Sequence, residues 1–271
     1  GELAAGSALN AIESSVTCYA AKLHLNKGSS IFNPERQRNS GYAEVFERVT
    51  RFTGRVQEIA QKRRPQQSDK PWLNDLKHLI FISDMGDAFT RRCDFEFLRT
   101  DVIPAINSQG GRTKIWQWLT KRPSLMAEFA QTIEGFPINV CAMTTVTSND
   151  TLGRVEELRQ VRAHLRGLSI EPLWERIDLD RLNLEGIDWL IVGGESGRRD
   201  LVSPFHVEWA EELRQYCEQN GVAFFLKQLG SKPFYRGLAL DLNDRHGGDW
   251  DEWPDHLRVR DFPHSFRQIM A

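Results

Sequence analysis

The sequence predicts an α/β protein built on a partial (β/α) TIM-like barrel of parallel strands. Six short apolar runs alternate with amphipathic stretches between residues 76 and 230, which is typical of strand-then-helix units with right-handed crossovers. The runs are continuous rather than alternating, as expected for strands buried on both faces. A polar cluster follows nearly every run. Such clusters converge at one mouth in a barrel, but only near the switch point in an open sheet, so a barrel is favoured.

The pattern divides the chain into three regions. Residues 1–75 form an irregular or helical N-terminal region, in which residues 42–61 carry apolar side chains at helical spacing. Residues 76–230 form the barrel core. Residues 231–271 form a C-terminal tail that we expect to pack on the barrel or its mouth through aromatic anchors.

The barrel core contains the regular elements. The expected strands are short and apolar: 78–82, 113–119, 138–143, 167–170, the run that begins at Ile187, and 222–226. The expected helices each have one apolar face: 95–106, 125–133, 149–164 and 207–219. We expect Gly110-Gly111 to close the first of these helices, because glycine is favoured just after a helix C-terminus.

The stretch from Ile187 to Gly197 places a carboxylate at the tip of a buried strand. Glu195 follows Gly193-Gly194, and glycines allow close approach of a ligand to the backbone. The alternative is that Glu195 satisfies free amides in a capping turn. Glu171 ends the preceding strand and needs a partner, because a buried unpaired carboxylate is costly. Lys121 or Lys227 can provide it.

Two further strand ends carry charged groups. Lys121-Arg122 follows Thr120 and suits a phosphate or carboxylate, with a solvated loop as the alternative. Asp84 and Asp87 flank Gly86, where they can bind a cation or an amino group, or Asp87 can cap the next helix.

The composition limits the classes of function. With a net charge of -2, the chain lacks a dominant, non-specific grip on nucleic acid phosphates. No apolar run approaches the roughly 20 residues that a membrane helix needs, and no secretory signal is visible, so we expect a cytoplasmic protein. The four cysteines show no Cys-x-x-Cys pair, and we expect Cys141 and Cys217 to be core residues.

Six short segments together carry a resemblance to a known family. They are Cys18-Tyr19-Ala20, Ser83 to Phe89, Leu119 to Pro123, Leu168 to Leu173, Ile187 to Gly197 and Phe224 to Gln228. In this order they resemble the phage-associated three-cysteine-motif proteins. That family is in turn similar to radical S-adenosylmethionine enzymes, spore photoproduct lyase among them.

The resemblance implies a cofactor site at the mouth of the barrel. Three cysteines would hold a [4Fe-4S] cluster, Cys18 among them, and its free iron would bind S-adenosylmethionine. Ser83, Asp84 and Asp87 would hold the methionine amino group. The other residues that the resemblance places at the mouth are the catalytic candidates Glu195, Glu171 and Lys227 and the cofactor-binding candidates Thr120, Lys121, Gly193, Gly194 and Gln228.

The sequence departs from this family at the cluster motif. The family motif ends just before Tyr-Ala, which leaves Cys18 as the only thiolate, and Ser15 stands at the expected second position. One cysteine cannot hold a cluster that needs three thiolates. Ala4, Ala8 and Ala11 have the Cys-x3-Cys-x2-Cys spacing with alanine throughout. Either the cluster was lost, or its ligands were replaced, or this N-terminus belongs to something else.

Two functions from different classes therefore stay open. The first is a radical S-adenosylmethionine-like enzyme that acts on a nucleotide or a nucleic acid. The second is a cluster-free binding protein for a nucleotide-like or anionic ligand in a phage or defence context, with a three-cysteine-motif protein as a partner. A third idea, nucleic acid binding through the basic residues between Arg36 and Arg64, competes with a solvated helix face.

Overall fold

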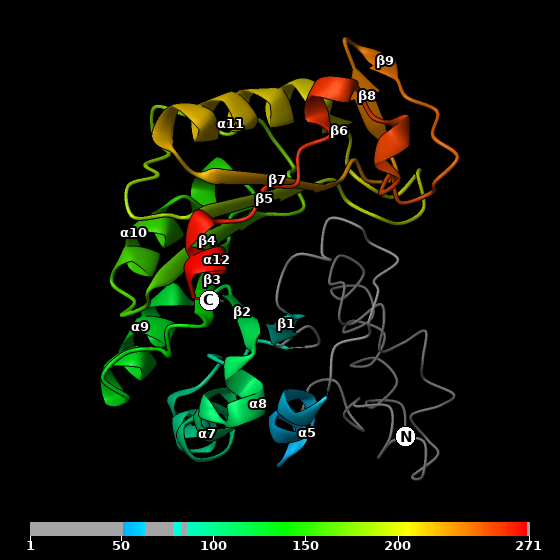
Figure 1. The fold of residues 1–271 in the computed structure, drawn as a ribbon. Helices are drawn as coiled ribbons and strands as arrows, with labels where there is room; N and C mark the ends of the chain where they lie inside the picture. Colours follow the sequence, from blue (N-terminus) through cyan, green and yellow to red (C-terminus); the bar gives the residue numbers. More distant parts are fainter. Residues whose placement is uncertain (1–50, 63–77, 83–85, 270–271) are drawn as a thin grey trace, which may run out of the picture.

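The core of the protein is a sheet of six parallel strands curled into a half-barrel (Figure 1). The computed structural model describes residues 51–62, 78–82 and 86–269. The strands are β1 (His78–Ile82), β2 (Lys114–Thr120), β3 (Val140–Thr145), β4 (Leu165–Ile170), β5 (Trp189–Gly193) and β7 (Ala223–Gln228). They pair in the order β1-β2-β3-β4-β5-β7, which never reverses. The predicted partial barrel is therefore confirmed, and an open doubly wound sheet is excluded.

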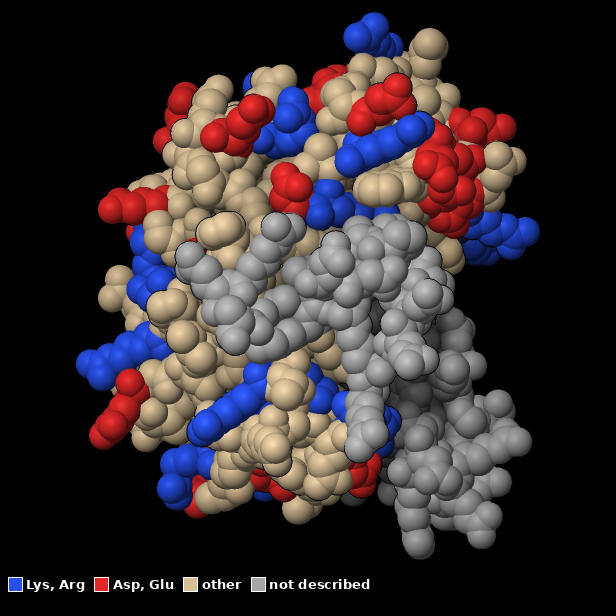
Figure 2. All heavy atoms as spheres, viewed as in Figure 1, with Lys and Arg blue, Asp and Glu red and all other residues tan. Residues whose placement is uncertain are grey.

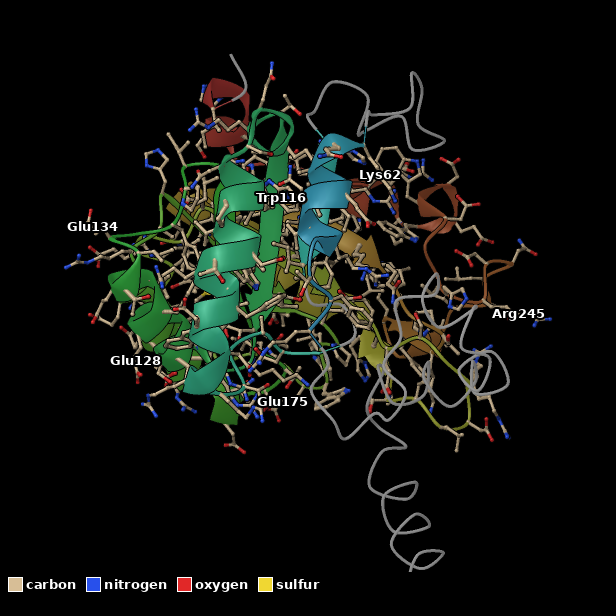
Figure 3. The ribbon with its side chains drawn as sticks, turned by 90° about the horizontal axis from the view of Figure 1, so that it is seen from below. Lys62, Trp116, Glu128, Glu134, Glu175 and Arg245 are labelled. Atoms are coloured by element: carbon tan, nitrogen blue, oxygen red, sulfur yellow. The ribbon has the colours of Figure 1, made fainter. Side chains whose placement is uncertain are left out.

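Helices cover the convex face of this sheet (Figure 1). They are α5 (Arg55–Gln61), α6 (Phe95–Phe97), α7 (Ile103–Asn107), α8 (Gln109–Arg112), α9 (Pro123–Thr132), α10 (Gly153–Arg159) and α11 (Val207–Asn220). A π-helical turn, η3 (Leu98–Val102), joins α6 to α7, and short 3-10 turns are η2 (Arg92–Asp94), η4 (Asn149–Thr151), η5 (Trp250–Glu252) and η6 (Asp255–Leu257). Trp116 lies in the interior between β2 and these helices (Figure 3), and its indole N–H donates to the Gly111 carbonyl.

The strands bury two separate cores because successive side chains of a strand point to opposite faces. The convex-face core includes Trp118, Leu168 and Leu190, packed against the helices. The concave-face core includes Met143 and Trp189. Burial on both sides explains why the strands are continuous apolar runs.

The C-terminal tail contributes to both cores: Trp253 and Leu257 pack in the convex-face core, and Phe262 and Phe266 pack in the concave-face core. It ends in α12 (His264–Gln268), which lies in front of β3 and β4 in Figure 1. The Phe266 ring packs edge-on against Trp189, with ring centroids 5.3 Å apart. The tail also pairs with the outer edge of β7, where the Leu226 amide donates to the Val259 carbonyl at 2.9 Å. The exposed edge of β7 is thereby covered.

Several predicted boundaries were wrong. Gly110-Gly111 does not close a helix: Ser108 starts the new helix α8, and its hydroxyl accepts from the Gly111 amide. These glycines instead allow close packing, since a Cβ at Gly110 would lie 2.3 Å from the Ala60 carbonyl oxygen. In the described part of 42–61, the helix begins only at Arg55, after Gly54 in a left-handed conformation.

Other boundaries differ by less. The helix predicted for 149–164 is the turn η4 followed by α10, which ends at Arg159, and β4 starts two residues earlier than predicted. A small second sheet was not predicted: β6 (Phe205–His206), β8 (Pro233–Tyr235) and β9 (Leu238–Ala239). Within the described ranges, no helix has the length and apolar character needed to cross a membrane.

Candidate functional site

The residues predicted to line the mouth lie at the C-terminal ends of the strands, but they do not all lie on the same face of the sheet. Phe225 and Leu119 belong to the concave-face core, so Lys227 shares the concave face, while Thr120 alternates to the convex face. The register between β5 and β7 shifts at this point, and Gln228 pairs across from Gly193. Gly193 shares the concave face with Trp189. The sheet therefore brings together only part of the predicted ring.

An ion pair between Glu171 and Lys227 is the centre of the candidate site. The Lys227 ammonium donates to Glu171 Oε1 at 2.7 Å and to Oε2 at 3.0 Å. The Glu171 side chain is 20% exposed and that of Lys227 is 52% exposed. Of the two partners predicted for Glu171, the structure selects Lys227 over Lys121.

The absence of a side chain at Gly193 leaves room for this ion pair. Glu171 follows β4 and Lys227 lies on β7, and β5 lies between these two strands. A Cβ at Gly193 would lie 3.2 Å from Glu171 Cγ and 3.3 Å from its Oε1. That spacing is tighter than most real contacts, so the missing side chain leaves room for the carboxylate to cross β5 and reach Lys227.

Glu195 makes its hydrogen bonds to the loops after β4 and β5. Its Oε2 accepts from the Ser203 amide at 3.2 Å and from the Trp174 indole N–H at 3.4 Å. Glu195 thus satisfies a loop amide, which is the kind of role that the capping alternative described. Its carboxylate fixes the loop after β5 to the segment after β4.

Gly194 and Gln228 pack and fasten the same loop. A Cβ at Gly194 would lie 2.2 Å from the Leu229 carbonyl oxygen, so only glycine fits without movement of the backbone. The Gln228 amide nitrogen donates to the Gly194 carbonyl at 3.0 Å and to the Ser196 hydroxyl at 2.6 Å. Both residues support the loop that follows β5.

Hydrogen bonds between Asp87 and Thr120 join the segment after β1 to the end of β2. The Thr120 hydroxyl donates to Asp87 Oδ1 at 2.8 Å, and the same oxygen accepts from the Phe89 amide at 3.0 Å. Asp87 Oδ2 accepts from the Lys121 amide at 2.9 Å and lies 3.6 Å from the Arg122 guanidinium. Asp87 does not cap the next helix, whose N-cap residue is Arg91; its oxygens instead accept from a turn and from the end of β2.

The remaining predicted residues fall into two groups. The Lys121 side chain is exposed. Cys18, Ser83 and Asp84 lie outside the described residues, and so do Ala4, Ala8 and Ala11.

Sequence reasoning did not single out the other polar residues of the concave face. Gln117 and Thr145 share that face with the core residues Cys141 and Met143, and Ser169 pairs across from Thr145. Strand alternation could have found them, since each stands an even number of residues from an apolar concave-face residue. Trp174, beside Glu195, was also missed. Its exposure depends on contacts between two loops, which no local pattern shows.

The cysteines do not fit a cluster with three thiolate ligands. Cys141 and Cys217 are both free and fully buried, the first in the concave-face core and the second in the convex-face core. Burial raises the pKa of both thiols, which opposes thiolate formation. Cys18 and Cys93 then remain, one fewer than the three that the cluster requires. Among the described residues, no group of three or more His, Cys, Asp or Glu is placed to hold a metal ion.

Comparison with known proteins identifies the family of the chain but assigns no activity to it. Residues 12–254 match the family described as "Protein of unknown function (DUF5131)". No curated protein and no solved structure matches the chain. The resemblance to three-cysteine-motif and radical S-adenosylmethionine proteins therefore stays a prediction. Because the match spans most of the sequence, the chain belongs to the DUF5131 family of proteins of unknown function.

Proposed function

We propose that the protein binds a nucleotide-like, anionic ligand at the C-terminal half of its concave face, without an iron–sulfur cluster. The Glu171–Lys227 ion pair carries this proposal. Ligand sites of β/α barrels lie at the C-terminal ends of the strands, where this pair is found. A half-exposed lysine held in place by a carboxylate can donate to a phosphate or carboxylate of a ligand.

The pair offers two kinds of contact to one ligand. Lys227 supplies a cation, and Glu171 supplies an acceptor for hydroxyl or amino groups. A nucleotide carries both an anion and such donors, so it complements the two side chains. A partly exposed ion pair adds only about 0–1 kcal/mol to stability. A contribution to folding is therefore a weak explanation for this pair.

The mixed surface charge supports recognition of the ligand by a few residues rather than non-specific binding to phosphate groups. In Figure 2, Lys and Arg side chains are interspersed with Asp and Glu over the described part of the viewed face. Such mixing gives no large field of one sign, which non-specific nucleic acid binding uses. A small ligand held by defined contacts fits this surface better.

The alternative, a radical S-adenosylmethionine-like enzyme acting on a nucleotide or nucleic acid, is less well supported by the cysteines. Buried Cys141 and Cys217 leave too few thiolates in this sequence for the cluster. A cytoplasmic location is part of our proposal, because free thiols are usual in a reducing compartment. The three-cysteine-motif partner and the phage or defence context stay predictions.

Calorimetric titration with AMP, adenosine and inorganic phosphate tests the proposal. Lys227→Met removes the cation and should weaken AMP and phosphate binding at least 10-fold, while Glu171→Gln frees the ammonium and should tighten phosphate binding. The control is Lys62→Met. Lys62 lies at the C-terminal end of α5 (Figure 3). This helix contacts Lys114, the first residue of β2, at the end of the sheet opposite to the ion pair. Equal affinities for wild type and Lys227→Met would refute the proposal.

Anaerobic reconstitution separates the two functions. With iron and sulfide added, we expect a colourless protein without bound iron that still binds AMP. A stable cluster that cleaves S-adenosylmethionine would favour the enzyme instead.

A further inference from the structure

We propose that Trp174 stacks on the base of the bound nucleotide whose anionic group the Glu171–Lys227 ion pair holds. This inference rests on the proposed function and names a second subsite for it. Trp174 is 44% exposed, although large apolar side chains are usually buried. An exposed aromatic ring on the segment that follows Glu171 can bind the flat face of a base.

The backbone around Trp174 is fixed on both sides of the ring. The amide of Leu173 donates to the Gly193 carbonyl at 2.9 Å, and Leu173 is 1% exposed. The amide of Trp174 donates to the Thr147 carbonyl at 3.3 Å. Next along the chain, Glu175 accepts from both the amide and the side chain of Asn149. The exposed ring therefore stands on a well-anchored segment.

The ring itself is oriented by the loop after β5. Its indole N–H donates to Glu195 Oε2, which also accepts from the Ser203 amide. A pre-oriented aromatic side chain loses little conformational freedom when a ligand binds, so affinity is gained.

The spacing suits one mononucleotide. Trp174 stands three residues after Glu171, so their Cα atoms are at most about 11 Å apart. The base and the phosphate of one nucleotide can reach across such a span. The ring, the acceptor Glu171 and the cation Lys227 would then contact the base, the sugar and the phosphate, respectively.

Binding of AMP and of ribose 5-phosphate to wild type and Trp174 variants tests this subsite. Trp174→Ala should raise the Kd for AMP roughly 5- to 150-fold, from the usual range for base stacking. It should leave the Kd for ribose 5-phosphate within about 2-fold. Trp174→Phe keeps a ring and should retain most of the affinity, whereas Trp174→Leu keeps apolar area without a ring and should lose it. Leu238→Ala, at an exposed leucine of β9, is the control.

The outcomes separate the two levels of the proposal. If Trp174→Ala leaves AMP binding unchanged, or weakens AMP and ribose 5-phosphate equally, the stacking inference is wrong, and the ring serves another contact such as a protein partner. If Lys227→Met also has no effect, the proposed function fails as well. AMP should quench tryptophan fluorescence in wild type, and Trp174→Phe should lose that quenching.

Discussion

Replacing Gly230 by alanine is expected to destabilise the protein strongly, because two costs combine at this position. Gly230 has φ +77°, a left-handed conformation that costs other L-residues about 1–2 kcal/mol. A Cβ there would also lie 2.7 Å from the Glu195 carbonyl oxygen and 2.7 Å from the Gly194 carbonyl carbon. Overpacking of this kind typically costs about 1–3 kcal/mol.

Gly221→Ala provides a matched control for the first cost. Gly221 has φ +67°, but nothing lies within 4 Å of a Cβ placed there. The control should therefore show the backbone cost alone, about 1–2 kcal/mol, and Gly230→Ala about 2–5 kcal/mol. The difference between the two variants isolates the close contact between the loops after β5 and β7.

Urea unfolding followed by tryptophan fluorescence measures both variants. The midpoint of Gly230→Ala should fall below that of Gly221→Ala at a similar m value. Because a domain is stable by only about 5–15 kcal/mol, the expected loss is large enough to detect easily. If Gly230→Ala unfolds at the same midpoint as Gly221→Ala, the close packing of Gly230 against the backbone of Gly194 and Glu195 is refuted.

Three further predictions concern single side chains. Burial raises the pKa of Asp188, so the folded state binds the proton more readily. The unfolding free energy of wild type should then increase, relative to Asp188→Asn, as pH falls toward the ordinary pKa of an aspartate, and parallel pH curves would contradict this. Glu195→Gln keeps an acceptor for the Trp174 indole N–H and should retain the AMP-induced quenching of fluorescence, whereas Glu195→Ala should weaken it. Equal quenching in both variants would argue against a role of Glu195 in positioning Trp174. Burial of Cys141 and Cys217 predicts that Ellman's reagent modifies at most two of the four thiols in native protein and all four in urea, and faster native labelling would place these thiols at the surface.

The strands were predictable because burial on both faces leaves a strong apolar signal. The run 78–82 matches β1 at both ends, and the runs at 113–119 and 222–226 fall within two residues of β2 and β7. Helix ends were harder to predict, since Gly110-Gly111 resembles a helix terminus in sequence. The contact that requires Gly110, with the Ala60 carbonyl, joins residues 50 positions apart.

The candidate site was predictable in one respect and hidden in others. Electrostatics alone required a partner for Glu171, and Lys227 is that partner. The role of Glu195 depends on its contacts with Ser203 and Trp174, which lie on two different loops. Loop-to-loop contacts leave no periodic trace in the sequence, so the ring of strand ends could not be sorted into facing and supporting residues in advance.

The strand order and the tail together decide where on the sheet a ligand can bind. With no reversal of strand order, the sheet has no switch point, so a site must come from the curvature of the concave face. The N-terminal half of that face is filled, because Phe266 packs on Trp189 among buried apolar side chains. Polar side chains begin only toward the C-terminal ends, where Glu171 and Lys227 pair over Gly193. The concave surface left for a polar ligand is therefore the surface that carries the ion pair, with Trp174 on the segment that follows Glu171.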